Sequence, residues 1–227
     1  MVNGAHNDKY LATVHYNPMM PCDHTVLGCG AEATVYRTTY LGRDAVVKTR
    51  LPKGYRHPEL DMRLRSSRTK HEAKVMIEAR RAGVRTPVIY DIDIKKCDIT
   101  MEYITGRKIK DVLDAEPSKA KELCREIGKT VAKLHNVGIS HGDLTTSNMI
   151  LMPDGEICIF DLSLGTATAE LEDLGVDIHL LQRAFTSAHS GLEDELKALM
   201  DSYSKNMKAS KSVLKRVDDI RGRARYT

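Results

Sequence analysis

Hydrophobic and polar residues follow a strand-like pattern in the first half of the chain. Branched and aromatic residues are frequent between Val26 and Thr49, where residues 34–40 and 45–48 flank a short turn. Such side chains suit a pleated, half-buried surface, so the pattern predicts a β-hairpin. Two further strands are predicted downstream, at residues 88–94 and 98–103.

Apolar residues recur at helical spacing in three segments of the chain. Residues 68–81 form the first, with Gly83 as a stop signal. The second begins at Pro117 and ends before Gly138, with apolar residues at Leu123, Ile127, Val131 and Leu134. The third starts at about Leu171, after a short predicted hairpin at residues 150–152 and 157–160.

Strands first and helices later in one chain predict an α+β protein with two lobes. We expect a single domain at 24–218, made of a small β-rich N-lobe at about 24–104 and a reduced, mostly helical C-lobe at about 105–218. An N-terminal extension (1–23) precedes this domain in the prediction, and a basic C-terminal tail (219–227) follows it.

Composition narrows the class of protein without identifying it. The 227 residues carry a formal net charge of +4, which is too small to indicate nucleic-acid binding. Five scattered cysteines without a C-x-x-C pair indicate reduced thiols in an intracellular protein. With no signal-peptide-like or membrane-spanning stretch, we expect a protein that is not secreted and does not contact membranes. The expected location is the cytoplasm, with the nucleus as the alternative.

The candidate chemistry lies between residues 141 and 161. The segment from His141 to Asn148 reads H-x-D-x-x-x-x-N, with Asp143 at its centre, and Asp161 follows a short apolar strand. Phosphoryl transfer requires an oriented nucleophile and metal ions placed across the phosphates. We therefore predict that Asp143 orients the nucleophile and that Asn148 and Asp161 ligate Mg²⁺. Asp143 or Asn148 alone would fit a turn cap or the start of a hairpin, but the complete spacing favours the catalytic interpretation.

A glycine-containing loop and a lysine lie upstream of this segment. Residues 28–35 read G-x-G-x-x-A-x-V, and a loop of this kind lets backbone N–H groups approach phosphates closely. Lys48 follows in an apolar strand, and Glu72 lies near the start of the predicted helix; such a pair would hold the α- and β-phosphates of ATP. The predicted nucleotide contacts from the loop are Gly28, Gly30, Ala31, Glu32, Ala33 and Val35.

The segment connecting the two lobes is predicted to contact the adenine base. Met101 and Glu102 end an apolar strand, and Ile104 follows before Gly106. The backbone of this connecting segment would hydrogen-bond the adenine, a placement that depends on chain order alone.

Several features of typical protein kinases are missing. Only fifteen residues separate Asp161 from Asp177, and no A-P-E motif is present, so an extended peptide lacks its usual platform. The triplet Asp161-Leu162-Ser163 replaces Asp-Phe-Gly, and Thr145 stands where typical protein kinases carry a lysine near the γ-phosphate. These departures are compatible with binding of nucleotide and metal, but they argue against broad protein phosphorylation.

Together with these motifs, further segments resemble the kinase/ATPase subunit of the KEOPS (EKC) complex over about residues 24–225. They are Gly30–Ala33, Tyr55–Asp61, Arg68-Thr69, Glu72-Ala73, Ala82–Val84, Thr86-Pro87, His141–Met149, Val176–Phe185 with His189, and Arg221–Arg225. The resemblance implies a bilobal protein-kinase-like fold and an atypical ATP- and Mg²⁺-dependent Ser/Thr kinase and ATPase. It also implies autophosphorylation and support of threonylcarbamoyladenosine formation on tRNA. Its implied partners are the threonylcarbamoyl-transferase subunit and the other KEOPS subunits.

The basic segments have two interpretations. Charge runs such as Arg50–Lys74 are usually solvated surfaces, whereas the final Arg221, Arg223 and Arg225 would form a flexible cationic tail. The resemblance favours tRNA or partner contact by this tail over a role in solubility.

Three other functions remain open at this point. They are a Ser/Thr kinase acting mainly on other proteins, a nucleotide-binding scaffold without catalysis, and a small-molecule kinase of the aminoglycoside type. The segments Gly30–Ala33 and Tyr55–Asp61 argue against the last of these.

Overall fold

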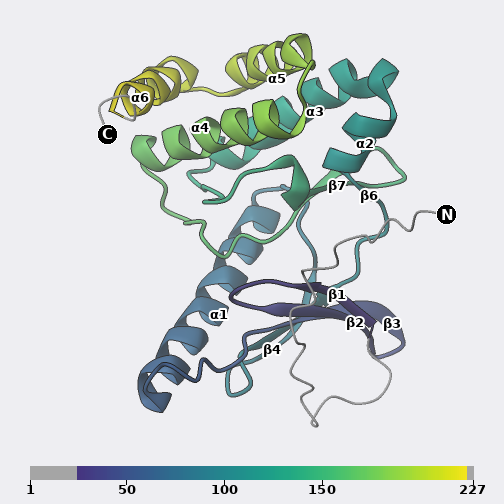
Figure 1. The fold of residues 1–227 in the computed structure, drawn as a ribbon, viewed down its shortest axis with the longest axis vertical. Coiled ribbons are helices and arrows are strands. Elements are labelled where there is room, and N and C mark those ends of the chain that lie inside the picture. Colours follow the sequence, from purple (N-terminus) through teal and green to yellow (C-terminus); the bar gives the residue numbers. More distant parts are fainter. Residues whose placement is uncertain (1–24, 224–227) are drawn as a thin grey trace, which may run out of the picture.

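The computed structural model describes residues 25–223 and arranges them in two lobes, as the sequence predicted (Figure 1). The predicted extension at residues 1–23 lies outside the described residues. The N-lobe is built on an antiparallel sheet with the strand order β1-β2-β3-β5-β4, accompanied by the long helix α1 (Pro58–Arg81). Its strands are β1 (Thr25–Cys29), β2 (Thr34–Tyr40), β3 (Arg43–Thr49), β4 (Ile89–Asp93) and β5 (Asp98–Glu102).

The predicted hairpin is confirmed as β2 and β3. Val35 lies opposite Lys48 in the register, and the turn between the strands uses positive φ angles at Leu41 and Gly42. Strand β3 is central, since β5 pairs along its other edge. The side chain of Lys48 is therefore presented from the middle of the N-lobe sheet, and this residue is only 7% exposed.

Helix α1 begins at Pro58, ten residues earlier than predicted. Proline at the first helical position and acidic residues in the first turn favour a helix start there. The apolar pattern failed to reveal this first part because it buries charged residues. Asp61 and Arg65, 2% and 8% exposed, are joined by an ion pair in which Arg65 Nε lies 2.6 Å from Asp61 Oδ2.

The C-lobe is built on helix α3 (Pro117–Asn136), which packs along α5 (Glu193–Asn206), while α4 (Leu171–Ala188) packs along α6 (Ser210–Arg223) (Figure 1). Gly128 allows the close approach of α3 and α5, because a Cβ there would collide with the carbonyl of Leu199. The remaining elements contact one another and the helices α3 and α4 of the C-lobe. They are β6 (Arg107–Lys108), α2 (Ile109–Ala115), the 3₁₀ turn η1 (Thr146–Asn148), β7 (Met149–Leu151) and β8 (Ile157–Ile159).

The prediction of a flexible tail starting at residue 219 is wrong for the described residues. Helix α6 continues to Arg223, and its last turns contact α4. Arg221 Nη2 donates to Gln182 Oε1 at 2.5 Å, and Arg223 Nη2 to Glu172 Oε1 at 2.6 Å. These side-chain contacts and buried Val213 and Val217 order the helix, whereas the sequence showed mainly its charges. Arg225 lies outside the described residues.

Candidate functional site

The ammonium group of Lys48 joins the two lobes. Its Nζ lies 2.8 Å from Oε1 of Glu72 on α1 and 2.6 Å from Oδ1 of Asp161, in the loop that follows β8. The sequence predicted the pair with Glu72 and placed Asp161 in the same site. The structure brings the three residues together at one point.

Glu72 has a second cationic partner that the sequence analysis missed. Arg50, just after β3, places Nη2 2.5 Å from Oε2 of Glu72, so each carboxylate oxygen faces a different cation. Glu72 and Arg50 are 1% and 2% exposed, so the cluster is buried. Arg50 Nε is also buried and has no hydrogen-bond partner among the described residues. The only sequence signal was a basic residue two positions after Lys48, on the same side of the strand.

The glycine-containing loop covers this cluster. Gly28 lies in β1 with Cys29, and the loop itself runs from Gly30 to Ala33, closed by a backbone hydrogen bond from Gly30 N to Ala33 O (2.9 Å). A pocket of about 580 Å³, named the phosphate pocket below after its predicted ligand, lies between this loop and Asp161. Its lining residues are Gly28, Cys29, Gly30, Ala31, Glu32, Ala33, Val35, Lys48, Arg50, Asp161, Ser163 and Leu164. The predicted loop residues thus line one pocket with Lys48 and Asp161.

Asp161 is held in an uncommon backbone conformation, with φ at +61°. Burial would raise the pKa of its carboxyl group, but the adjacent charge and hydrogen bond of Lys48 and the hydroxyl of Ser163 outweigh burial and lower it. Ser163 Oγ donates to Asp161 Oδ1 at 2.8 Å. Asp161 is therefore an anion at neutral pH, as a ligand of a hard cation must be.

Asp143 and Asn148 lie together at the C-lobe side of the site. Asn148 Nδ2 donates to the main-chain oxygen of Asp143 at 2.9 Å and to its Oδ2 at 3.0 Å. Since its nitrogen is committed to Asp143, the Asn148 side-chain oxygen is directed elsewhere. The Asp143 side chain is exposed, which leaves it accessible to a substrate hydroxyl group or water.

His141 and Asp177 hold the segment 141–148, named the catalytic loop below after its predicted role. His141 Nδ1 accepts the N–H of Asp143 (3.2 Å), so Nε2 carries the proton and donates to the carbonyl of Phe160 (3.0 Å). Burial lowers the pKa of His141 and favours this neutral form. Asp177, fully buried on α4, accepts the N–H groups of His141 (2.5 Å) and Gly142 (2.8 Å).

The positioning role of Asp177 was missed, although the sequence carried a signal for it. Asp177 occupies the same helix face as Leu174, Ile178 and Leu181, where an isolated carboxylate needs a buried partner. The same carboxylate also lies 3.3 Å from Nε2 of His135, whose Nδ1 is 2.9 Å from the Tyr203 hydroxyl. His135 is thus a buried, hydrogen-bonded residue.

The segment after Asp161 is short and packed against the catalytic loop. Gly142 has a φ of +81°, and a Cβ there would collide with the carbonyl of Leu164. Gly165 similarly approaches the carbonyl of Ser140, and His71 Nε2 on α1 lies 2.6 Å from the carbonyl of Gly165. The chain enters α4 directly afterwards, so it forms no extended activation segment here.

The segment that connects the two lobes lies outside the phosphate pocket. Met101 is 6% exposed in β5, and the carboxylate of Glu102 forms two hydrogen bonds to Arg85, at 2.8 and 2.6 Å. The N–H of Glu102 donates to Val88 O (2.8 Å), so it is already engaged. Within residues 25–223, the Ile104 N–H has no main-chain acceptor. Met101, Glu102 and Ile104 do not line the phosphate pocket, and their adenine contacts stay a prediction.

The donor set fits Mg²⁺. Magnesium is usually held by one or two protein carboxylates or amides together with phosphates and water. Asp161 supplies a carboxylate and Asn148 an amide oxygen turned away from its own hydrogen bonds. Among the described residues, no group of three or more His, Cys, Asp or Glu could hold a metal ion by itself. Besides Asp161 and Asn148, a bound Mg²⁺ would need further oxygens from phosphate and water.

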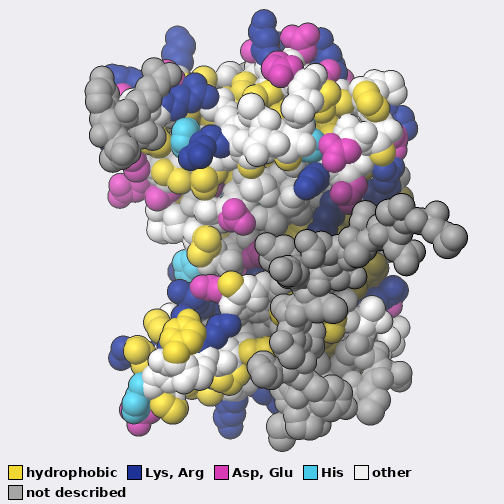
Figure 2. All heavy atoms as spheres, in the orientation of Figure 1, with side chains coloured by type: hydrophobic (Ala, Val, Ile, Leu, Met, Phe, Trp, Pro, Cys, Tyr) yellow, Lys and Arg dark blue, Asp and Glu magenta, His cyan; other side chains and the backbone are white. Residues whose placement is uncertain are grey.

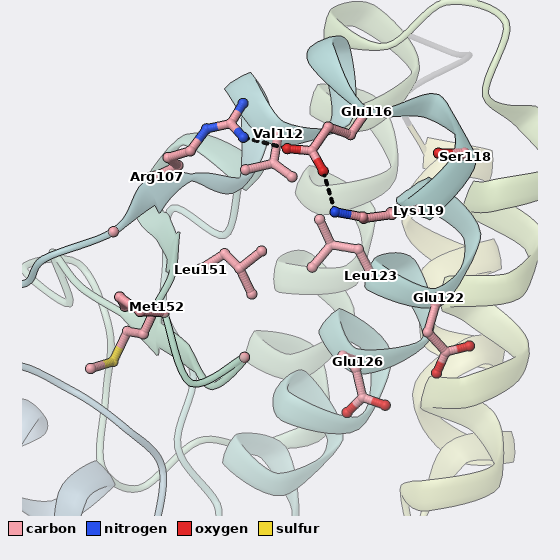
Figure 3. A pocket seen from close by; sticks show the side chains of 13 residues that line it. Arg107, Val112, Glu116, Ser118, Lys119, Glu122, Leu123, Glu126, Leu151 and Met152 are labelled. Carbon is pink, nitrogen blue, oxygen red and sulfur yellow. Dashed lines mark hydrogen bonds and ion pairs between the residues drawn. The ribbon is translucent and has the colours of Figure 1, made fainter.

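A second pocket, of about 560 Å³, lies between α2, the start of α3 and the β7–β8 turn (Figure 3). Leu123 and Leu151 form part of its largely apolar wall, and Glu116 is already paired with both Arg107 and Lys119. Glu122 and Glu126, which also line it, pair with Arg125 and Lys129 on the same helix. Figure 2 shows Lys and Arg side chains scattered over both lobes on the displayed face rather than gathered into one patch.

The chain matches known proteins over most of its length. A family model described as "RIO domain" matches residues 37–197. The KEOPS complex subunit Bud32 of Pyrococcus abyssi is 38% identical over 209 residues, which cover 87% of this chain and 94% of that protein. The EKC/KEOPS complex subunit Tp53rkb of Mus musculus is 39% identical over 206 residues, covering 86% and 84%.

Longer relatives also match. A "Probable bifunctional tRNA threonylcarbamoyladenosine biosynthesis protein" of Methanosarcina mazei is 43% identical over 202 residues, which are 88% of this chain and 35% of that protein. The chain therefore spans about a third of the length of these bifunctional relatives. None of the helices within residues 25–223 is long and apolar enough to cross a membrane.

The resemblance that the motifs predicted is confirmed by relatives matched along almost their full length. The chain belongs to the RIO-domain family and, within it, to the kinase-like Bud32 subunits of KEOPS/EKC complexes.

Proposed function

We propose that this protein binds ATP with Mg²⁺ and hydrolyses it as the kinase/ATPase subunit of a KEOPS complex, in support of threonylcarbamoyladenosine formation on tRNA. The observation that carries the proposal is the contact of Lys48 with both Glu72 and Asp161 beneath the glycine-containing loop. An ordinary surface lysine would not be 7% exposed between two carboxylates from different lobes.

The residues divide into binding and reacting groups. Lys48, oriented by Glu72, would hold the α- and β-phosphates, with backbone N–H groups of residues 28–33 above them. Asp143 would accept a hydrogen bond from the attacking water or hydroxyl group and orient it toward the γ-phosphate. Asn148 and Asp161 would hold Mg²⁺, which when bound neutralises charge that develops on the transferred phosphoryl group. The connecting segment, through Met101, Glu102 and Ile104, would receive the adenine.

Hydrolysis is proposed over phosphorylation of extended peptides because of the short segment after Asp161. Residues 162–170 pack against the catalytic loop and α1 through Gly142, Gly165 and His71. They offer little surface for aligning an extended substrate strand. Transfer to a nearby Ser or Thr of the same chain, that is autophosphorylation, requires no such platform and is part of the proposal.

The proposed partners are the threonylcarbamoyl-transferase subunit and the other subunits of a KEOPS complex. The names of the full-length relatives support this assignment, and the bifunctional relatives support a close link to threonylcarbamoyladenosine synthesis. Contact with tRNA would be indirect or through the basic C-terminal residues. A cytoplasmic location, with the nucleus as the alternative, is proposed on the same basis.

The test is steady-state release of phosphate from Mg²⁺·ATP, measured for the protein alone and with the transferase subunit. Partner-stimulated release that Asp161→Ala abolishes would support the proposed ATPase. A pull-down of the variant with the partner must show that assembly is intact. Absence of hydrolysis by the wild-type protein in an intact complex would favour a nucleotide-binding scaffold instead. Efficient, sequence-selective phosphorylation of a free protein would favour a protein kinase.

A further inference from the structure

The loop between β3 and α1, residues 50–57, reaches the glycine-containing loop. Lys53 Nζ donates a hydrogen bond to the carbonyl oxygen of Ala31 at 2.6 Å. Ala31 lines the phosphate pocket, so the ammonium group of Lys53 lies at its margin. The roles proposed above do not use this loop, although it contains part of the Tyr55–Asp61 motif.

Buried charges fix the position of this loop. Asp61 Oδ1 accepts the main-chain N–H of Lys53 (3.3 Å), and Arg65 Nη1 donates to the carbonyl of Arg50 (3.1 Å). Asp61 and Arg65 are themselves paired, and Arg56 Nη1 lies 3.6 Å from Asp61 Oδ1. Because a buried ion pair needs such additional hydrogen bonds, Asp61 and Arg65 hold the backbone of the loop at Arg50 and at Lys53. The backbone of Lys53 is thus fixed by these contacts, while its side chain can exchange one hydrogen-bond acceptor for another.

The partner of Lys53 is a weak one for a cation. Lys48 and Arg50 share the carboxylate of Glu72, and Arg68 pairs with Glu32. In the part of the chain that the structure describes, Lys53 has no carboxylate within ion-pair distance. A charged phosphate oxygen is a stronger acceptor than a neutral carbonyl, so bound ATP would compete well for this ammonium group.

The catalytic loop lacks a cation near the terminal phosphate, and Lys53 could supply one. Thr145, two residues after Asp143, stands where typical protein kinases direct a lysine toward the terminal phosphate. Thr145 carries no charge. Lys48 is assigned to the α- and β-phosphates, and Arg50 is 2% exposed against Glu72. Of the described cations near the glycine-containing loop, Lys53 is the one without a carboxylate partner.

We propose that Lys53 binds the terminal phosphate of ATP and exchanges the Ala31 carbonyl for a γ-phosphate oxygen. Lys53 would thereby take the role of the catalytic-loop lysine, whose position is occupied by Thr145 in this chain. The proposal rests on the proposed ATP-binding function. It assigns to the Tyr55–Asp61 motif the task of presenting Lys53 to the nucleotide. The flexible four-carbon stem of lysine allows the exchange without movement of the pinned backbone.

The test compares the affinities for ATP and ADP of the full chain in the presence of Mg²⁺, measured by calorimetry. ADP lacks the phosphate in question. Lys53→Met should weaken ATP binding about tenfold and ADP binding less than about twofold. Lys53→Arg should retain the preference for ATP. Thr145→Lys added to Lys53→Met should restore most of the lost ATP affinity, because it returns a cation from the other side of the site.

Two control variants separate phosphate binding from loop tethering. Lys70→Met, on the exposed side of α1, should leave both affinities unchanged. Arg68→Met removes the other tether of the glycine-containing loop, at Glu32, and should affect ATP and ADP alike. Equal losses for ATP and ADP in Lys53→Met, or no loss for either, would overturn the proposal. If the wild-type protein bound neither nucleotide, the proposed ATP-binding function itself would fail.

Discussion

Nζ of Lys48 lies 2.6 Å from Oδ1 of Asp161, so a central strand of the N-lobe and a loop of the C-lobe meet at a single ion pair. Lys48 is simultaneously 2.8 Å from Glu72 on α1. Three elements that are far apart in the sequence thus converge on one ammonium group. Nucleotide phosphates and Mg²⁺ would enter beside this contact, where they compete with it for Lys48 and Asp161 respectively.

The shared carboxylate of Glu72 predicts an asymmetric loss of stability. Glu72→Ala would leave Lys48 and Arg50 buried without their common anion, which should lower the free energy of unfolding by about 3 kcal/mol or more. Lys48→Met leaves Glu72 paired with Arg50 and should change the free energy of unfolding by about 1 kcal/mol or less. Urea denaturation followed by circular dichroism measures both values. Equal losses would show that the two cations do not depend on Glu72 in the way described.

Substitution of Asp143 should separate turnover from binding. Its exposed side chain contacts Asn148 but does not line the phosphate pocket. Asp143→Ala should therefore lower kcat for ATP hydrolysis by about 10²- to 10⁴-fold while the Kd for ATP changes by less than about twofold. Asp154→Ala, in the exposed β7–β8 turn, is the matched control and should leave both unchanged. A collapse of ATP affinity in Asp143→Ala would contradict the assigned role.

The sequence motifs placed the site residues more accurately than the apolar pattern placed the ends of the surrounding helices. Lys48, Glu72 and Asp161 could be placed together because their order and spacing reflect one geometric requirement, a phosphate chain held between two lobes. Arg50, Lys53 and Asp177 could not, since each acts through a contact with a residue distant in the sequence. A carboxylate on the apolar face of α4 indicates that Asp177 has a buried partner, but not that its partners are the N–H groups of His141 and Gly142.

The two misplaced boundaries have a common physical cause. The first turns of α1 bury the ion pair of Asp61 with Arg65, and the last turns of α6 are held partly by Arg221 and Arg223. Apolar periodicity detects helices that bury hydrocarbon, so it overlooks segments ordered by charge pairing. Helix α3 lacks this difficulty, because its buried residues other than His135 are apolar.

The hydroxyl group of Ser163 should support metal binding by Asp161. Its hydrogen bond helps to keep the pKa of this carboxyl group low, against the opposing effect of burial. Ser163→Gly restores the third residue typical of kinases but removes this bond. The Mg²⁺ concentration that gives half-maximal ATPase activity should rise about two- to tenfold. A fall in that concentration would indicate that Ser163 instead obstructs the site.

Burial of neutral His141 predicts a dependence of stability on pH. Desolvation lowers its pKa in the folded protein, so between this value and about 6.5 the unfolded chain binds the extra proton. The stabilisation is complete above pH 6.5 and is lost as the pH falls through that window.

His141→Gln should therefore flatten the pH profile of stability. The slope of unfolding free energy against pH, measured by urea denaturation between pH 5 and 7, should decrease by up to ~1.4 kcal/mol per pH unit relative to wild type. Parallel profiles for the two proteins would mean that His141 does not contribute.

The basic residues at the end of α6 should affect the tRNA reaction more than the fold. Arg221 and Arg223 are substantially exposed, and exposed ion pairs contribute little, so replacing both with alanine should lower stability by about 1 kcal/mol or less. If they contact tRNA phosphates, threonylcarbamoylation by the complete complex should weaken, and its dependence on salt should become shallower by about two counterions. Replacing Lys211 and Lys215, also exposed on α6, removes the same charge from another part of the helix and serves as the control. Equal effects of the two double substitutions would assign the contribution to net charge, whereas an unchanged tRNA reaction in both would remove α6 from tRNA recognition.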